Sequence, residues 1–291
     1  MPGMNNAPIG IFDSGFGGLT VARAIRDKLP GEQLLFFGDT ARCPYGSRDL
    51  REVRSFVREL CTWFARREVK LIVIACNTAT AAGLALAQME FSVPVMGVLE
   101  PGARGAVRAT RNRRCGVIAT RATVDSGVYS DTIRSLDAGI TVYSAAAPRF
   151  VEIVEEGLRR SDSPVERLTA DAADVYLRPA FTEIARDYLD PLKKAGVDTL
   201  VLGCTHYPVL APLVQQAVGR DVKLISSSAE TADEVVATLS CRGHLHDESP
   251  APADEFFTTG EDLDDFRQVG GKIYGRPIER VSHVGFDELA L

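Results

Sequence analysis

Two cysteines of the chain lie in matching settings, each directly after a short apolar run. Cys76 follows residues 71–75 and precedes Asn77 and Thr78, and Cys204 follows residues 199–203 and precedes Thr205. An apolar run that leads into cap-forming residues predicts a buried strand followed by a helix. We therefore expect both cysteines at the carboxyl ends of strands, where open α/β sheets bind their ligands.

The chemistry available to such a pair is proton transfer. A free thiol has a pKa of about 8.5, and a helix amino terminus stabilises the thiolate. One thiolate could take a proton from a substrate carbon while the other thiol delivers one to the opposite face. This is two-base racemisation or epimerisation, and it needs neither a metal nor a pyridoxal cofactor. The alternative role, a small buried hydrophobe, is favoured for the remaining cysteines, Cys43, Cys61, Cys115 and Cys241.

Other polar residues fall at the ends of predicted strands or beside the two cysteines. They are Asp13, Ser14, Asp39, Asn77, Thr78, Thr120, Thr205 and His206. Each alone could be a helix cap, and His206 could equally be a hydrogen-bonded core histidine. Together they would line one cleft with groups that suit carboxylates and an ammonium group and that can tune thiols.

The elements that must position these residues alternate along the chain. We expect strands at 9–12, 34–37, 71–75 and 93–97, followed by a second series at 115–120, 140–143, 200–202 and 222–225. The helices predicted between and after them span 19–29, 49–66, 80–89, 124–136, 150–158, 165–194 with an interruption at Pro179, a segment after Pro208, and 229–239. Strands that alternate with such helices indicate parallel sheets with right-handed crossovers.

The second series repeats the first, with Gly116 in the place of Gly10 and Cys204 in the place of Cys76. Any two βα units look alike, so chance similarity is the alternative to a duplication. We predict an α/β fold of two pseudo-symmetric domains, each a mostly parallel sheet flanked by helices, with the active site in the cleft between them. The first domain would comprise residues 1–98 plus 229–291, and the second residues 99–228.

The last part of the chain has a different pattern. Residues 243–255 indicate a loop, and residues 256–259 and 280–284 indicate short strands. We expect no third full βα unit here, and we expect the tail to pack back onto the first half.

Composition limits the kind of protein. The chain of 291 residues is 45% hydrophobic and 25% charged, with a formal net charge of −6, as in soluble globular proteins. No basic face suggests a nucleic-acid partner, no apolar run approaches the ~20 residues of a membrane helix, and residues 1–8 do not resemble a secretion signal. Six scattered cysteines indicate reduced thiols and a cytoplasmic location.

Two further patterns are weaker. Cys241, His244 and His246 have loose metal-like spacing, but no fourth ligand is in view, and we predict no metal site. Gly15, Gly17 and Gly18 match neither a dinucleotide fingerprint nor a P-loop, and they are more typical of a tight turn.

Four motifs give the chain a family resemblance. They are the runs at residues 12–18 (FDSGFGG), 38–46 (GDT followed by PYG), 75–80 (ACNTAT) and 202–208 (LGCTHYP). In order and spacing they resemble the glutamate racemases of the cofactor-independent aspartate/glutamate racemase superfamily. The similarity runs from about Ile9 to Asp287.

The resemblance implies interconversion of L- and D-glutamate without a cofactor, with D-glutamate supplied to peptidoglycan synthesis in a bacterial cytoplasm. Cys76 matches the base toward D-glutamate, and Cys204 the base toward L-glutamate. Asp13 matches the acid beside the first thiol, Glu155 and His206 match the pair beside the second, and Asp39 matches a further acid. Substrate contacts carry over to Asp13, Ser14, Pro44, Tyr45, Gly46, Cys76, Asn77, Thr78, Thr120, Thr123, Cys204, Thr205 and His206.

The match is weakest around Glu155, because this chain lacks a cysteine and a proline that are common there in the family. Glu152 and Glu156 therefore compete with Glu155 as the assisting acid, and Glu155 is favoured. A homodimer is expected, although the sequence gives no oligomeric state. An aspartate or hydantoin racemase, or a decarboxylase, is the alternative within the superfamily. Inhibition of DNA gyrase, as in some glutamate racemases, is an alternative of another class.

Overall fold

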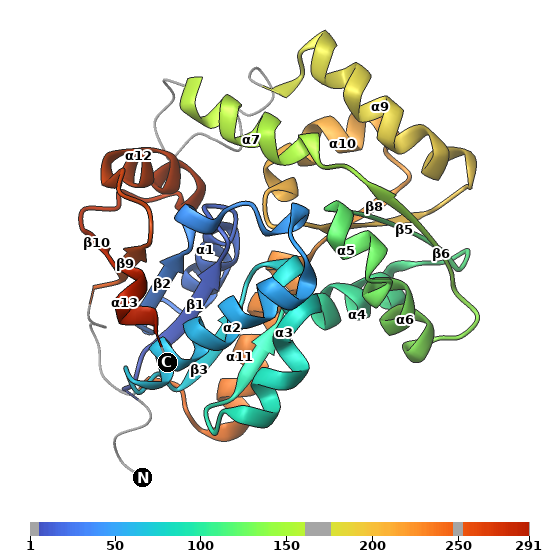
Figure 1. Ribbon diagram of the computed structural model, residues 1–291. Coiled ribbons are helices and arrows are strands. Elements are labelled where there is room, and N and C mark those ends of the chain that lie inside the picture. Colours follow the sequence, from blue (N-terminus) through green and yellow to red (C-terminus); the bar gives the residue numbers. More distant parts are fainter. Residues whose placement is uncertain (1–5, 161–175, 247–252, 291) are drawn as a thin grey trace.

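The computed structural model describes residues 6–160, 176–246 and 253–290. Within these ranges the strands form two sheets, one of six strands in the order β10-β9-β2-β1-β3-β4 and one of four in the order β6-β5-β7-β8 (Figure 1). Every strand pair is parallel. The strands are β1 (Ile9–Asp13), β2 (Leu34–Gly38), β3 (Leu71–Ile74), β4 (Val95–Gly97), β5 (Arg114–Ala119), β6 (Thr141–Ala146), β7 (Thr199–Gly203), β8 (Lys223–Ser226), β9 (Glu255–Thr258) and β10 (Val281–His283).

Helices connect and cover the strands. The α-helices are α1 (Leu19–Lys28), α2 (Leu50–Ala65), α3 (Asn77–Glu90), α4 (Leu99–Ala109), α5 (Arg121–Asp125), α6 (Val128–Leu136), α7 (Arg149–Arg160), α9 (Pro179–Lys194), α10 (Ala211–Val218), α11 (Ser227–Arg242), α12 (Leu263–Tyr274) and α13 (Phe286–Leu289). Short 3-10 turns are η1 (Thr40–Arg42), η2 (Tyr45–Ser47) and η4 (Tyr207–Leu210).

The first sheet is buried on both faces because its strands are apolar throughout. Successive side chains of a strand point to opposite faces, so alternate residues reach the same face. On β1, Ile9 and Ile11 belong to one buried cluster, and on β3, Ile72 and Ile74 belong to another. A stripe on α2, which includes Val57, packs into the second cluster. Burial of each such side chain contributes roughly 1.5–3 kcal/mol. Parallel sheets covered on both faces have this kind of sequence.

The two halves share one strand order, as the predicted duplication requires. In the first half β1 pairs with β2 on one side and with β3 on the other, and β4 follows β3. In the second half β5 pairs with β6 and β7 in the same way, and β8 follows β7. The predicted fold class of two similar α/β halves is confirmed.

The prediction that the tail forms no further unit is wrong. β9 pairs with β2, β10 pairs with β9, and α12 connects them, so the tail is a βαβ unit that extends the first sheet. The predicted return of the tail to the first half is confirmed.

Two helix predictions also need correction. No helix is predicted between residues 97 and 115, but α4 spans Leu99–Ala109; Pro101 is its third residue, and the first turn of a helix tolerates proline. The helix predicted at 124–136 is divided into α5 and α6 by Gly127, whose φ of 70° is left-handed. Pro179 begins α9 after a break at residues 177–178, and Tyr176 before this break is helical, so the predicted interruption is confirmed; the part of that prediction at 165–175 lies outside the described residues.

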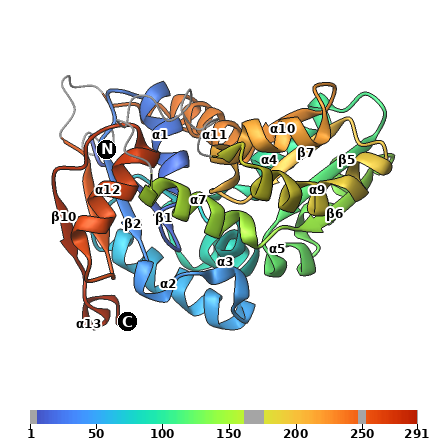
Figure 2. The same cartoon turned by 90° about the horizontal axis from the view of Figure 1, so that it is seen from above.

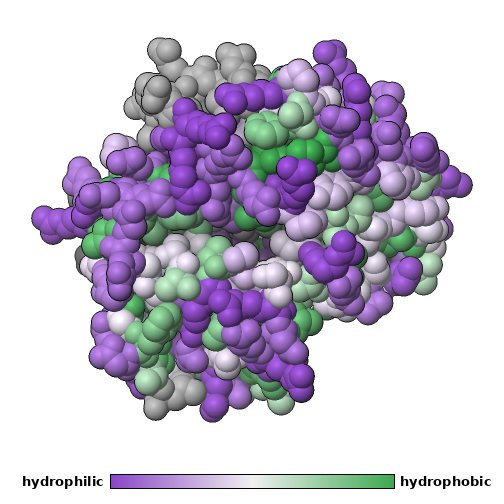
Figure 3. All heavy atoms as spheres, turned by 45° about the horizontal axis from the view of Figure 1, so that its top comes forward, coloured by the Kyte–Doolittle hydropathy of each residue, from purple (hydrophilic) through white to green (hydrophobic). Residues whose placement is uncertain are grey.

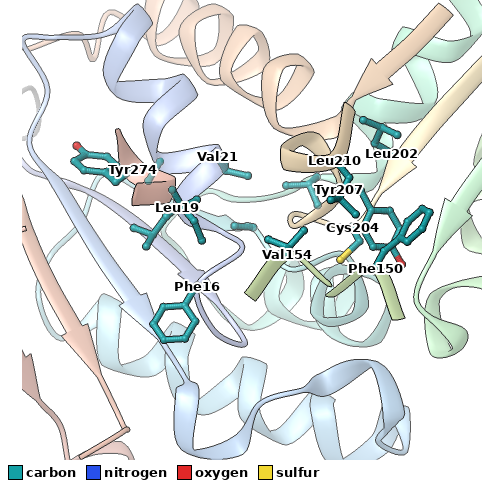
Figure 4. Close-up of a cluster of buried hydrophobic side chains, with 14 of the residues drawn as sticks. Phe16, Leu19, Val21, Phe150, Val154, Leu202, Cys204, Tyr207, Leu210 and Tyr274 are labelled. Atoms are coloured by element: carbon teal, nitrogen blue, oxygen red, sulfur yellow. The ribbon is translucent and has the colours of Figure 1, made fainter. Parts of the chain in front are cut away.

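One buried cluster joins the two halves. It contains Phe16 and Leu19 from the first half together with Val154 and Leu210 from the second, as Figure 4 shows. α11 directly follows β8 of the second sheet, yet it packs along α1 and α4 (Figure 2). The predicted domain boundaries, at residues 98 and 228, stay a prediction.

Most of the outer face in Figure 3 is hydrophilic, and weakly polar and apolar side chains gather toward its middle. Among the described helices, none combines the length and the apolar character that a membrane crossing demands.

Candidate active site

The two cysteines stand at equivalent strand ends. Cys76 comes two residues after β3 and is the N-cap of α3, where its sulfur accepts a hydrogen bond from the Ala79 backbone N–H at 3.5 Å. Cys204 directly follows β7 and precedes the turn η4. Parallel strands of equivalent order therefore bring one thiol from each half to the same edge of the molecule.

Both thiols line one cavity of about 530 Å³ between the halves. This volume lies in the range of small-molecule sites. Its first-half lining residues are Ser14, Cys43, Pro44, Tyr45, Gly46, Ser47, Cys76, Asn77 and Thr78. Its second-half lining residues are Thr120, Arg121, Pro148, Val151, Glu152, Cys204, Thr205 and His206.

The Cys76 thiol is held in its neutral form. Burial and the nearby Asp13 raise the pKa of Cys76 to about 12, against the hydrogen bond from the Ala79 N–H and the contact with Ser14, whose Oγ lies 3.8 Å from the sulfur. The helix amino terminus was expected to lower the pKa of Cys76, but the raised pKa contradicts this expectation. The helix does point an N–H group at the sulfur, but desolvation outweighs it.

The Cys204 thiol has a different neighbour. Nδ1 of His206 lies 3.8 Å from the Cys204 sulfur, and Nε2 of the same ring lies 3.1 Å from Oε1 of Glu155. Burial alone would lower the pKa of His206, but interactions with Cys204 and Glu155 outweigh it and raise the pKa to about 10. The ring is therefore an imidazolium at neutral pH.

The three competing glutamates separate clearly in the structure. Glu155 contacts His206, and although burial would raise the pKa of Glu155, His206 and Arg159 together lower it. Glu156 forms an ion pair with Arg160, and Glu152 is exposed on the wall of the cavity. The favoured assignment of Glu155 thus agrees with its contact to the histidine.

Asp13 lies fully buried behind the cavity wall. It accepts a hydrogen bond from the Gly15 backbone N–H at 3.0 Å and from the Thr205 hydroxyl at 3.4 Å. Burial raises the pKa of Asp13, while the charge of His206 acts in the opposite direction. Asp13 therefore interacts with the surroundings of both thiols.

Asp39 is also fully buried, and its hydrogen bonds hold residues that form the cavity wall. Its carboxylate accepts hydrogen bonds from the Tyr45 hydroxyl, from Arg42 Nε at 2.7 Å and from Thr259 Oγ1 at 2.8 Å. Tyr45 in turn lines the cavity, next to Pro44 and Gly46. The structure places Asp39 as a support of this wall, not beside either sulfur.

Three threonines form a cluster of hydroxyl groups across the two halves. Oγ1 of Thr78 lies 3.0 Å from that of Thr120 and 3.2 Å from that of Thr123, and the latter two lie 3.0 Å apart. Gly46 packs on this cluster so closely that a Cβ would lie 2.8 Å from Thr120 Cβ. Thr78 and Thr120 line the cavity, and Thr123 holds both from behind.

Asn77 carries a free donor at the cavity. Its Oδ1 accepts a hydrogen bond from the Tyr129 hydroxyl at 2.8 Å, and its buried Nδ2 has no hydrogen-bond partner among the described residues. A buried amide of this kind is costly unless something pairs with it. The donor therefore suits a ligand oxygen.

Sequence reasoning did not single out several residues of this region. Cys43, assigned to a structural role, lines the cavity, and so do Arg121 and Pro148. Tyr129 supports Asn77 from the opposite half. Cys43 stands beside the Pro44-Tyr45-Gly46 motif, a signal that could have found it; Arg121 and Tyr129 belong to no motif.

The other cysteines and the weak metal pattern are resolved as follows. Cys61 and Cys115 are buried, as predicted, whereas Cys241 is exposed, which contradicts its assignment as a buried hydrophobe. Across the described residues no group of three or more His, Cys, Asp or Glu side chains could hold a metal ion. Backbone atoms of His244 and His246 instead contact Lys70 and Glu32.

The fold and the site define an α/β enzyme of two similar halves with one cysteine of each half at a shared cavity. A family model described as Asp/Glu/hydantoin racemase matches residues 19–235. The glutamate racemase of Bacillus cereus is 41% identical over 96% of this chain and 97% of its own length, and that of Mycobacterium leprae is 43% identical over 94% of each.

Solved structures agree with these matches. Glutamate racemase isoform RacE1 from Bacillus anthracis superposes with a TM-score of 0.86 at 40% identity, over 96% of this chain and 98% of that one. The Francisella tularensis enzyme, solved with D-glutamate, gives 0.84 at 31% identity, over 97% and 99%. The chain belongs to the Asp/Glu/hydantoin racemase family, among its glutamate racemases, and it is an isomerase.

Proposed function

We propose that the chain interconverts L- and D-glutamate without a cofactor, with Cys76 and Cys204 as the two bases. The observation that carries this proposal is the shared cavity, to which each half contributes one thiol in a polar setting of its own. The substrate is proposed from the family, since relatives over nearly the whole chain are glutamate racemases.

With D-glutamate, the Cys76 thiolate takes the α-proton, and the electron pair of the C–H bond stays on the α-carbon next to the carboxylate. The Cys204 thiol then donates its proton to the opposite face, which forms L-glutamate and leaves Cys204 as a thiolate. With L-glutamate the two cysteines exchange roles. Each turnover thus uses one base and one acid.

The two thiols have different electrostatic surroundings. Nδ1 of the His206 ring lies 3.8 Å from the Cys204 sulfur, and Glu155 stabilises the imidazolium form of that ring. Burial beside Asp13 keeps the proton on Cys76.

Recognition of the substrate is proposed to rest on uncharged donors. Asn77 Nδ2 offers an unpaired N–H group, and Ser14, Thr78, Thr120 and Thr205 offer hydroxyls on the same cavity. Such donors bind carboxylates, and Asp13 behind the wall suits an ammonium group.

The biological role is proposed as the supply of D-glutamate for peptidoglycan in a bacterial cytoplasm. Support comes from the bacterial sources of the relatives. A homodimer is also expected, and light scattering of the purified protein would measure its mass.

A circular-dichroism assay tests the reaction. The dialysed protein should abolish the optical activity of L-glutamate and of D-glutamate with no added cofactor, and it should do so equally in EDTA and after treatment with hydroxylamine, which removes pyridoxal phosphate. Aspartate should keep its optical activity under the same conditions. Folded protein that leaves both glutamate enantiomers unchanged would refute the proposal, and a preference for aspartate would move it to the alternative within the superfamily.

A further inference from the structure

A chain of charged contacts leads outward from Cys204 to the surface. After the contacts from Cys204 to His206 and from His206 to Glu155, the other carboxylate oxygen of Glu155 lies 3.5 Å from Nη1 of Arg159. Arg159 follows Glu155 by one turn on α7, so the two side chains lie on one face of that helix.

Arg159 is held from the other half of the molecule. Its Nη2 lies 3.1 Å from Oδ2 of Asp265, and its Nε lies 3.3 Å from Oδ1, which is a two-point contact. Asp265 is in the first turn of α12, which packs on α7 where the two halves meet (Figures 1 and 2). Planar, bidentate arginine–carboxylate pairs of this kind fix geometry as well as charge.

The setting of Arg159 is strongly acidic. It lines a second cavity of about 560 Å³, here named the approach, which adjoins the thiol cavity and shares Cys43, Pro44, Val151 and Glu152 with it. Arg159 is the one cation among the described lining residues of this approach, against five carboxylates, Glu152, Glu155, Glu261, Asp262 and Asp265. Three further groups interact electrostatically with the Glu155–His206 pair. Cys43 interacts with Glu155, and both Asp13 and Cys204 interact with His206.

We propose that Arg159, held by Asp265, is a positioning residue of the racemase site that orients the Glu155 carboxylate toward His206 and keeps it ionised. The proposal rests on the proposed function. The Arg159–Asp265 pair also makes the site depend on the docking of two helices, because the Glu155–His206 contact is fully supported only when α7 and α12 lie together. The state of the Cys204 thiol is thereby linked to the fit between the halves.

The charges agree with this role. Both the charge of Arg159 and its hydrogen bond act to lower the pKa of Glu155, together with His206. Without Arg159, four neighbouring carboxylates remain on the approach, and their repulsion favours a protonated Glu155. A neutral Glu155 would no longer stabilise the imidazolium beside Cys204.

The test compares two neighbouring arginines of α7. Arg159→Gln removes the contact to Glu155, and Arg160→Gln removes a similar one-turn ion pair, with Glu156, that makes no contact with the site. The measurement is kcat/KM against pH. Enantiomers have equal free energy, so kcat/KM must be the same in both directions, and a single profile describes the free enzyme.

We expect Arg159→Gln to shift the acidic limb of this profile to higher pH, because Glu155 then becomes protonated at higher pH. Near neutral pH the loss in kcat/KM should be about two- to fivefold, the scale of a partly exposed ion pair. Arg159→Lys should restore part of the shift, and Arg160→Gln should overlay the wild type. A limb that stays in place in Arg159→Gln, or moves equally in Arg160→Gln, would overturn the proposal.

Asp265→Asn provides the second variant. It should shift the same limb in the same direction, and its effect should not add fully to that of Arg159→Gln, since both act through one contact. Fully additive shifts would contradict the coupling. If the wild type fails to racemise glutamate, the proposed function fails; an active wild type with unshifted variants refutes only the role of Arg159.

Discussion

At the scale of single residues, the two thiols differ in what surrounds them. Cys204 has an imidazolium within 3.8 Å, whereas Cys76 has a buried carboxylate nearby and a pKa raised to about 12. The two cysteines therefore occupy equivalent positions in the fold, but the charged groups next to them have opposite signs.

Alkylation by iodoacetamide should reveal this difference, because the thiolate is the reactive form. At pH 7 Cys204 should react faster than Cys76 in the free enzyme. The His206 imidazolium persists up to about pH 10, whereas the thiolate fraction of Cys76, far below its pKa of about 12, should rise about tenfold per pH unit. Peptide mass spectrometry in a Cys241→Ser background, which lacks the exposed thiol, gives the site-specific rates.

His206→Asn is the control for that experiment. It should slow the modification of Cys204 and leave the rate at Cys76 nearly unchanged. Faster modification of Cys76 than of Cys204 at pH 7 would contradict the proposed difference between the surroundings of the two thiols.

The sequence could predict those site residues that lie at or within two residues of a strand's carboxyl end, because these ends meet at one edge of a parallel sheet. They include Asp13, Cys76, Cys204 and Thr205. Tyr129 and Arg159 could not be found in this way. Their roles depend on contacts from the opposite half, to Asn77 and Asp265, and no local pattern encodes such contacts.

At the scale of elements, the turn between β1 and α1 positions the loop that follows Cys204. A Cβ on Gly17 would lie 2.3 Å from Thr205 Oγ1 and 2.5 Å from His206 Nδ1. The predicted tight turn therefore serves a close approach between the two halves. Only a residue without a side chain leaves room there for the histidine beside Cys204.

Gly17→Ala should lower the free energy of unfolding by about 1–3 kcal/mol, as overpacking does. It should also reduce kcat at least tenfold, since a displacement of His206 separates it from Cys204. Gly31→Ala is the matched control, because none of the described atoms lies within 4 Å of its added Cβ. Thermal melts and the racemisation assay would compare them, and full activity of Gly17→Ala would contradict this role.

The helices that sequence patterns missed contain glycine or proline, which are unfavourable in helix interiors unless tertiary contacts compensate. No helix was predicted at residues 99–109, yet α4 contains both Pro101 and Gly102. α12 contains Gly270 and Gly271, and a Cβ on Gly270 would lie 3.0 Å from Leu19, so this glycine allows close packing on α1. The cap at Asp262, which accepts a hydrogen bond from the Asp265 N–H, was the available signal for this helix.

At the scale of the whole molecule, the two sheets share one buried cluster in addition to the cluster that each half has of its own. One buried cluster contains Ile11 of β1 and Leu200 of β7, and it also takes in Val235 of α11. The halves are therefore distinct in topology and continuous in packing. The strand patterns predicted the first property, but the shared core depends on how the halves dock.

Unfolding should accordingly be one cooperative transition. In scanning calorimetry we expect a single peak whose calorimetric and van't Hoff enthalpies agree. Two resolved transitions would show that the halves unfold independently, and would contradict the shared core.

The central claim, that two thiols act on opposite faces of one carbon, is tested most directly in deuterated water. We predict that D-glutamate formed early from L-glutamate carries deuterium at its α-carbon, because its proton comes from the second cysteine, which has exchanged with solvent. Mass spectrometry of the separated enantiomers would measure it. Product that retains the original protium would show return of the same proton by a single base, and would contradict the account.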